Sequence, residues 1–157
     1  MESYLDILEN SLQKKAQILD RIQIANQKQL TLLEKNELDL EKYDAYVDEK
    51  AECIEALNKL DEGFELLYRN IAEELQKDRA KYAIQISRLQ QLIREVTEKS
   101  VTIQAQETRN KDKVTAYFSH RKQELKHARV SSRAAFDYYQ SMNNLKNVEA
   151  QFMDQKK

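Results

Sequence analysis

Apolar residues recur along most of this chain at spacings of three and four, which is the period of a helix with one buried face. The first column of this kind, in residues 2–35, contains Leu5, Leu12, Leu19 and Leu33. Leucines seven residues apart are typical of helices that pack in the manner of a coiled coil. The spacing therefore predicts one long helix over residues 2–35.

A second helix is predicted over residues 40–76, and Asp39 precedes it as a residue type that caps a helix start. Its apolar stripe is wide enough for a helix with two neighbours rather than one. Gly63 lies inside this helix, where it predicts a close contact or a slight bend. The stripe consists of Leu40, Tyr43, Val47, Ile54, Leu57, Leu60, Phe64, Leu67, Tyr68, Ile71 and Leu75.

A third helix is predicted over residues 79–130, with Asp78 as its cap. Its apolar pattern thins in residues 104–113 and returns in a narrower form, so we expect this helix to extend beyond its partners. Short connections make consecutive helices antiparallel neighbours. The sequence thus predicts an all-α fold, an antiparallel bundle of three long helices with coiled-coil-like packing over residues 1–130.

Residues 131–157 form a distinct C-terminal tail. The pair Ser131 and Ser132 weakens helix continuity, and large apolar residues follow at spacings that permit one amphipathic helix. Because the stripe comes after the bundle pattern has ended, we interpret it as a partner-binding surface; docking back on the bundle is the alternative. The stripe consists of Phe136, Tyr139, Met142, Leu145, Val148 and Phe152, with Tyr138 beside it.

Polar residues interrupt the apolar columns of the first and third helices. Asn26 and Asn110 are examples, and Lys15 and Gln29 interrupt a neighbouring column. A polar side chain at a core position costs stability but fixes the register of packed helices. A surface position near a helix end is the alternative for both asparagines.

Composition excludes most enzyme classes. The chain has no proline, and Gly63 is its only glycine, whereas phosphate-binding loops and nucleophile elbows require glycines. Strong helix formers dominate the sequence instead. We therefore expect no catalytic activity and no cofactor.

Two residue groups contain metal-binding or reactive side chains. His120, Glu124 and His127 share one helix face at spacings of four and three, but Arg121 and Lys122 beside them repel a cation. We interpret this group as a solvated basic face and predict no metal site. Cys53 has acidic neighbours, which raise a thiol pKa, so a buried structural thiol is the simpler interpretation.

Charge is balanced overall but not locally. The net charge is −1, yet residues 109–133 are mainly basic and residues 34–78 mainly acidic. A basic stretch can bind phosphates or an anionic membrane. Charge complementarity within the chain, or an acidic protein partner, explains it more simply, so we predict no nucleic-acid binding.

The sequence also bears on localisation. Glu2 follows Met1 in place of a basic leader, and no apolar run approaches the length needed to cross a bilayer. Cys53 is the only cysteine, which fits a reducing compartment. We expect a soluble cytoplasmic protein without membrane insertion.

The chain resembles the FlgN-type flagellar export chaperones, in particular their clostridial members. The residues that carry the resemblance are the leucine heptads of the first helix, residues 38–44 (LDLEKYD), Lys59–Asp61 with Phe64, residues 103–110, and the ending formed by residues 134–139 and 152–157. Tails of this family often place a glycine soon after a tyrosine, whereas Gln140, Ser141 and Met142 follow Tyr139 here.

The resemblance implies a cytosolic chaperone that keeps a terminal helical segment of a flagellar hook-filament junction protein soluble before type III export. It also implies that a tail tyrosine, Tyr138 or Tyr139, docks to the export gate. We expect client contacts from the tail stripe together with Tyr117, Phe118 and Leu125. A structural coiled-coil protein that self-associates through the same columns is the alternative, and a homodimer remains open.

Overall fold

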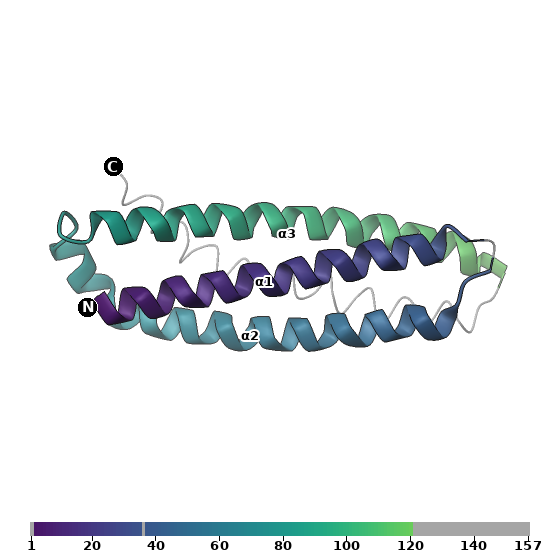
Figure 1. The fold of residues 1–157 in the computed structure, drawn as a ribbon, viewed down its shortest axis with the longest axis horizontal. Helices are drawn as coiled ribbons and strands as arrows, with labels where there is room; N and C mark the ends of the chain where they lie inside the picture. Colours follow the sequence, from purple (N-terminus) through teal and green to yellow (C-terminus); the bar gives the residue numbers. More distant parts are fainter. Residues whose placement is uncertain (1, 36, 121–157) are drawn as a thin grey trace.

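The computed structural model describes residues 2–35 and 37–120, which form three long antiparallel helices. These are α1 (Glu2–Leu33), α2 (Leu40–Lys77) and α3 (Ala83–Tyr117), and a 3-10 turn, η1 (Phe118–His120), follows α3. Figure 1 shows the helices lying lengthwise beside one another. The predicted all-α three-helix bundle is confirmed, and the described residues contain no strand.

The first two helices have nearly the predicted bounds. Asp39 caps α2 as expected, because its carboxylate accepts a hydrogen bond from the backbone N–H of Lys42 at 3.1 Å. Glu41 lies in the first turn of α2 and Lys77 in the last, where their charges complement the helix dipole.

The third helix differs from its prediction at both ends. Asp78 ends α2 instead of capping α3, since its backbone N–H donates to the carbonyl of Glu74 at 3.2 Å. The chain then turns, and this turn buries the Tyr82 side chain in the core. Regular α-helix ends at Tyr117, where a 3-10 turn places Phe118 in the core. Within the described residues α3, with 35 residues, does not exceed α2, with 38.

Three apolar clusters fill the bundle from one end to the other. The first, at the start of α1, joins Leu8 to Phe64 and Leu89. The second, in the middle, joins Leu19 to Leu57 and Val96. The third, at the opposite end, consists of Leu32, Tyr43, Val114 and Phe118. Each cluster therefore draws side chains from all three helices, and the third also draws Phe118 from the turn after α3.

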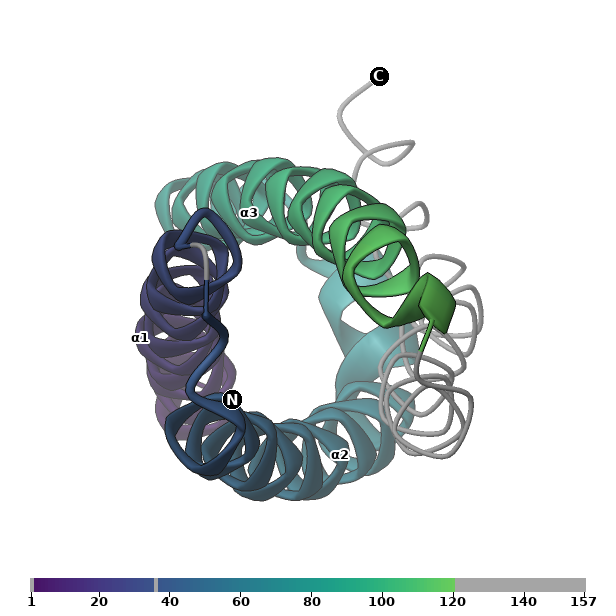
Figure 2. The ribbon, with the colours of Figure 1, turned by 90° about the vertical axis from the view of Figure 1, so that its right-hand side faces the viewer.

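The helices are not packed as an equilateral triangle. α1 packs against both α2 and α3, whereas no Cα atom of α2 lies within 8 Å of a Cα atom of α3. Viewed along the bundle, α1 lies between the other two on one side (Figure 2). With Cα atoms about 2.3 Å from each axis, this separation puts the α2 and α3 axes at least about 12 Å apart, beyond the usual 8–10 Å of packed helices.

Candidate functional site

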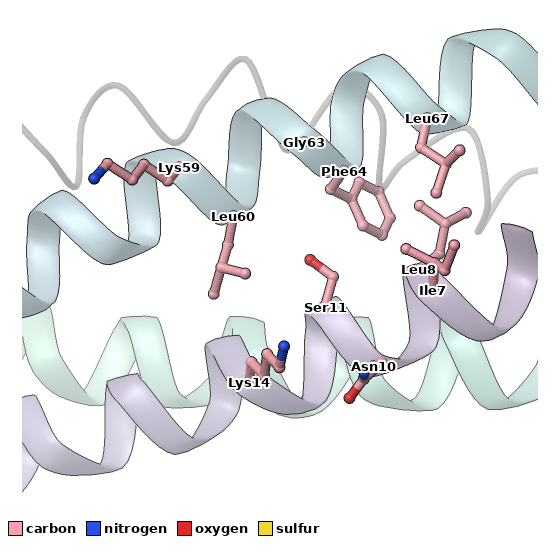
Figure 3. Close-up of a pocket in the computed structure, with 10 residues that line it drawn as sticks. All are labelled: Ile7, Leu8, Asn10, Ser11, Lys14, Lys59, Leu60, Gly63, Phe64 and Leu67. Carbon is pink, nitrogen blue, oxygen red and sulfur yellow. The ribbon is translucent and has the colours of Figure 1, made fainter.

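A groove of about 230 Å³ lies on the surface between α1 and α2 (Figure 3). It sits near the start of α1, over the first apolar cluster. Its lining alternates apolar and polar side chains from both helices. These residues are Ile7, Leu8, Asn10, Ser11 and Lys14 of α1, and Lys59, Leu60, Gly63, Phe64 and Leu67 of α2.

Small residues keep this groove hollow. Ser11 and Gly63 belong to the two facing helix surfaces (Figure 3). A Cβ atom built on Gly63 would meet no atom within 4 Å. The predicted close contact at Gly63 is therefore wrong: the glycine borders open space, and its missing side chain contributes to the groove.

The groove combines an apolar floor with a basic rim. Leu8 and Phe64 are buried beneath it, whereas Ile7 is 54 % exposed. Lys14 and Lys59 are exposed and line the rim. An exposed isoleucine above an apolar floor is a surface that gains free energy when a partner covers it. The two lysines favour a partner that carries negative charge beside its apolar side chains.

A buried polar layer, which we define as Asn26, Lys50, Glu107 and Asn110, lies between the second and third apolar clusters. The Lys50 ammonium donates to Glu107 Oε1 and to Asn26 Oδ1, both at 2.9 Å. Lys50 and Glu107 side chains are only 10 % and 5 % exposed. Asn110 Nδ2 donates to the backbone carbonyl of Asn26 at 3.0 Å. One residue or more from each helix thus meets in a single network.

Further hydrogen bonds surround the polar layer and involve two glutamines and a tyrosine carbonyl. Asn26 Nδ2 donates to Gln106 Oε1 at 3.2 Å, and Gln29 Nε2 donates to the carbonyl of Tyr43 at 3.3 Å. Burial raises the pKa of the Tyr43 phenol above its ordinary value, and the charges of Glu107 and Asp44 raise it further. Tyr43 therefore keeps its proton at pH values where an exposed tyrosine loses it.

A second buried cation lies nearer the groove. The Lys15 side chain is 2 % exposed, and its Nζ lies 2.9 Å from Asp61 Oδ1 of α2. This contact is an ion pair without the alignment of a hydrogen bond. It connects α1 to α2 directly after the groove-lining Lys14 and one turn beyond Ser11.

The polar interruptions noted in the sequence are all buried. Asn26 and Asn110 have exposed fractions of 0 % and 2 % and share a hydrogen bond, which supports the register interpretation over the surface alternative. Sequence reasoning missed Lys50 and Glu107. Lys50 comes seven residues after Tyr43, and Glu107 comes seven residues before Val114, so each interrupts an otherwise apolar column. The available signal was that the two interrupting residues carry opposite charges.

The predicted partner-binding residues divide into two groups. Phe118 is 1 % exposed inside the third cluster, and the Tyr117 hydroxyl accepts a hydrogen bond from the backbone N–H of Leu38 at 3.1 Å. These two residues pack edge to face and hold the end of α3 against the start of α2. The remaining predicted contacts lie outside the described residues: Leu125, Phe136, Tyr138, Tyr139, Met142, Leu145, Val148 and Phe152.

Cys53 is buried in the middle cluster, as predicted. Burial raises the pKa of its thiol; among the nearby charges Arg21 lowers it, and Glu49 and Glu52 raise it. No group of three or more His, Cys, Asp or Glu side chains in residues 2–35 and 37–120 is arranged to hold a metal ion. Glu124 and His127 of the assessed histidine group lie outside that part of the chain.

None of the helices in the described part of the chain is both long and apolar enough to cross a bilayer. Comparisons with protein-family models, with curated proteins and with solved structures found no match to this chain.

Proposed function

We propose that this protein is a cytoplasmic chaperone that binds an amphipathic terminal helix of a client and keeps it soluble. By the family resemblance, the client is a flagellar hook-filament junction protein bound before type III export. The single observation that carries the binding role is the groove between α1 and α2, where exposed Ile7 stands over an apolar floor. A helix laid into a groove of this kind is a common mode of protein recognition.

The groove defines the chemistry of the segment that it accepts. Its apolar positions on α2, Leu60 and Leu67, are seven residues apart, which is two helical turns. A client helix with apolar residues at spacings of three and four matches this length. Acidic residues beside that stripe would meet Lys14 and Lys59 at the rim. Burying a side chain the size of Ile7 contributes about 1.5–3 kcal/mol.

The packing of the bundle supports binding through the groove rather than through the heptad columns. Leu5, Leu12 and Leu19 are 2 % exposed or less and form the bundle's own core. The leucines of these columns therefore already pack against residues of the same chain. An intermolecular zipper through the same residues, as in the structural alternative, would require the bundle to open.

The tail stripe is the second contact in this proposal. Residues 131–157 carry Phe136, Tyr139, Met142 and Leu145 at helical spacing, and they would cover the client face that the groove leaves exposed. Docking of Tyr138 or Tyr139 to the export gate is part of the same proposal and rests on the family resemblance alone.

A groove-filling substitution tests the proposal. Gly63→Leu places a side chain in the open space without a clash at its Cβ, so we expect a folded protein that binds the purified junction protein of the same organism at least tenfold more weakly in calorimetry. Asn58→Leu, on an exposed position of α2 outside the groove lining, is the matched control. Equal binding by both variants would reject the groove, and no binding by the native chain would reject the client.

A further inference from the structure

We propose that residues 121–157 pack against the sides of α2 and α3 that face away from α1, which we call the fourth corner, and so complete a four-helix arrangement. This inference concerns the protein without a client, and it does not depend on the identity of that client. Three features of the described residues and of the sequence lead to it.

The first feature is the spacing of the helices. In a four-helix bundle, neighbouring helices pack directly and diagonal helices do not. α1 packs against α2 and α3, while α2 and α3 keep their Cα atoms more than 8 Å apart. Their axial separation of at least about 12 Å fits the diagonal, roughly 11–14 Å, of a square whose sides are the usual 8–10 Å between packed helices. The three helices thus occupy three corners, with α1 opposite the fourth (Figure 2).

The second feature is burial on the side of α3 opposite α1. Lys99 faces α1, because its ammonium donates to Asp20 at 2.6 Å. Gln90 is nine residues earlier, which at about 100° per residue puts it on the opposite side of α3. Its exposed fraction is nevertheless only 3 %. Thr97 and Gln104, on the same side of the helix, are half-buried.

The equivalent side of α2 has the same character. Gly63 lies in the groove toward α1, and Ile54, nine residues earlier, lies on the opposite side of the helix. Ile54 is half-buried, and so are Val47 and Ala72 along the same edge. The apolar stripe of α2 is therefore wide enough for a neighbour on each side, and α1 covers only one of them.

The third feature is the length and direction of the chain after η1. Phe118 and Tyr43 share a cluster, so the chain leaves η1 beside the start of α2. A segment that returns along the bundle runs parallel to α2. Residues 121–157, as a helix of about 55 Å, match the length of α2. In this register, residues 126–133 lie beside residues 48–55, and residues 136–152 lie beside residues 58–74.

In the same register the apolar tail stripe lies level with the half of α2 that contains Phe64, Tyr68 and Ile71 of the first cluster. Apolar residues of the tail and of α2 therefore match along this part of the bundle.

Distances between pairs of spin labels test the placement. One label is attached at Gln140→Cys in the full chain, with Cys53→Ala as background, and the second at an exposed position of one bundle helix. Asn58→Cys reports on α2, Arg94→Cys on α3 and Gln13→Cys on α1, and all three positions are exposed. We expect short, narrow distances from Gln140 to the α2 and α3 labels and a clearly longer distance to the α1 label.

Each other outcome overturns the inference. A shortest distance to Gln13 would place the tail at the groove or elsewhere along α1. A broad distribution for all three pairs would mean that the tail has no fixed site. Distances that disappear when labelled protein is diluted with excess unlabelled protein would show that a second copy fills the corner.

Client binding in calorimetry is measured separately, so failure of the docking leaves the groove proposal standing.

Discussion

The two halves of this bundle solve the same packing problem with different chemistry. The first cluster, at the start of α1, consists of hydrophobic side chains such as Leu8, Phe64 and Leu89. The hydrophobic effect that holds them together does not depend on direction. The polar layer near the other end depends on the match of donor to acceptor, as between Lys50 and Glu107. A helix can slide by a turn over apolar neighbours at moderate cost, whereas the same slide leaves a buried charge unpaired. The apolar half supplies stability, and the polar layer specifies the alignment.

Breaking the ion pair of the polar layer is the largest expected effect. Lys50→Met leaves the Glu107 carboxylate buried without its cation, which should cost about 3–5 kcal/mol. Adding Glu107→Leu should recover most of this loss, because both charges are then gone. Urea unfolding of the single and double variants measures both values. An equal loss of stability in the single and double variants would mean that the loss comes from the missing ion pair, not from a buried carboxylate without its cation.

Alkaline pH should weaken the polar half specifically. The Tyr43 pKa is raised in the folded protein, so the unfolded chain loses its phenolic proton first. The contribution of Tyr43 to the free energy of unfolding is therefore fully present below about pH 10. As pH rises further, the free energy of unfolding falls by at most about 1.4 kcal/mol per pH unit for this one group. Tyr43→Phe should reduce this decline in urea unfolding between pH 9 and 11.5. The same slope in both proteins would assign the decline to other groups, among them Lys99, whose pKa is also raised by its hydrogen bond to Asp20.

A conservative change in the apolar half should have the smallest effect. Ile93→Val removes one methylene from the first cluster and should cost about 0.5–1.5 kcal/mol. Thermal unfolding followed by circular dichroism, with the native chain as reference, measures the difference. A loss as large as that of Lys50→Met would show that the apolar half is as intolerant of change as the polar layer.

Heptad spacing predicted the three helices well because a one-residue slip would expose an entire apolar column. The start of α2 was also predictable, since Asp39 satisfies a backbone N–H within its own turn. The start of α3 was not predictable from the sequence, because Asp78 could either end α2 or cap α3. In the structure it ends α2, and the turn that follows buries Tyr82. That choice depends on packing between helices distant in sequence.

The candidate site was harder to predict than the fold. The groove arises where small residues of two helices, Ser11 and Gly63, come to face each other, and neither residue signals this alone. Lys50 and Glu107 are 57 residues apart, and only the tertiary packing shows that their charges meet. The tail residues predicted to bind a partner lie outside the described residues.

The position of α1 between the other two helices has a consequence for the order of folding. α1 is made first, yet its hydrogen bonds to α3 span sequence separations of 76 to 84 residues. α2 can join α1 as a hairpin while the chain is still being synthesised, but α3 has no backbone packing with α2 on which to grow. Closing the longest loop is therefore the late step, and contacts that are distant in sequence slow folding. During translation, the face of α1 that α3 will cover stays exposed until residues 83–117 have left the ribosome.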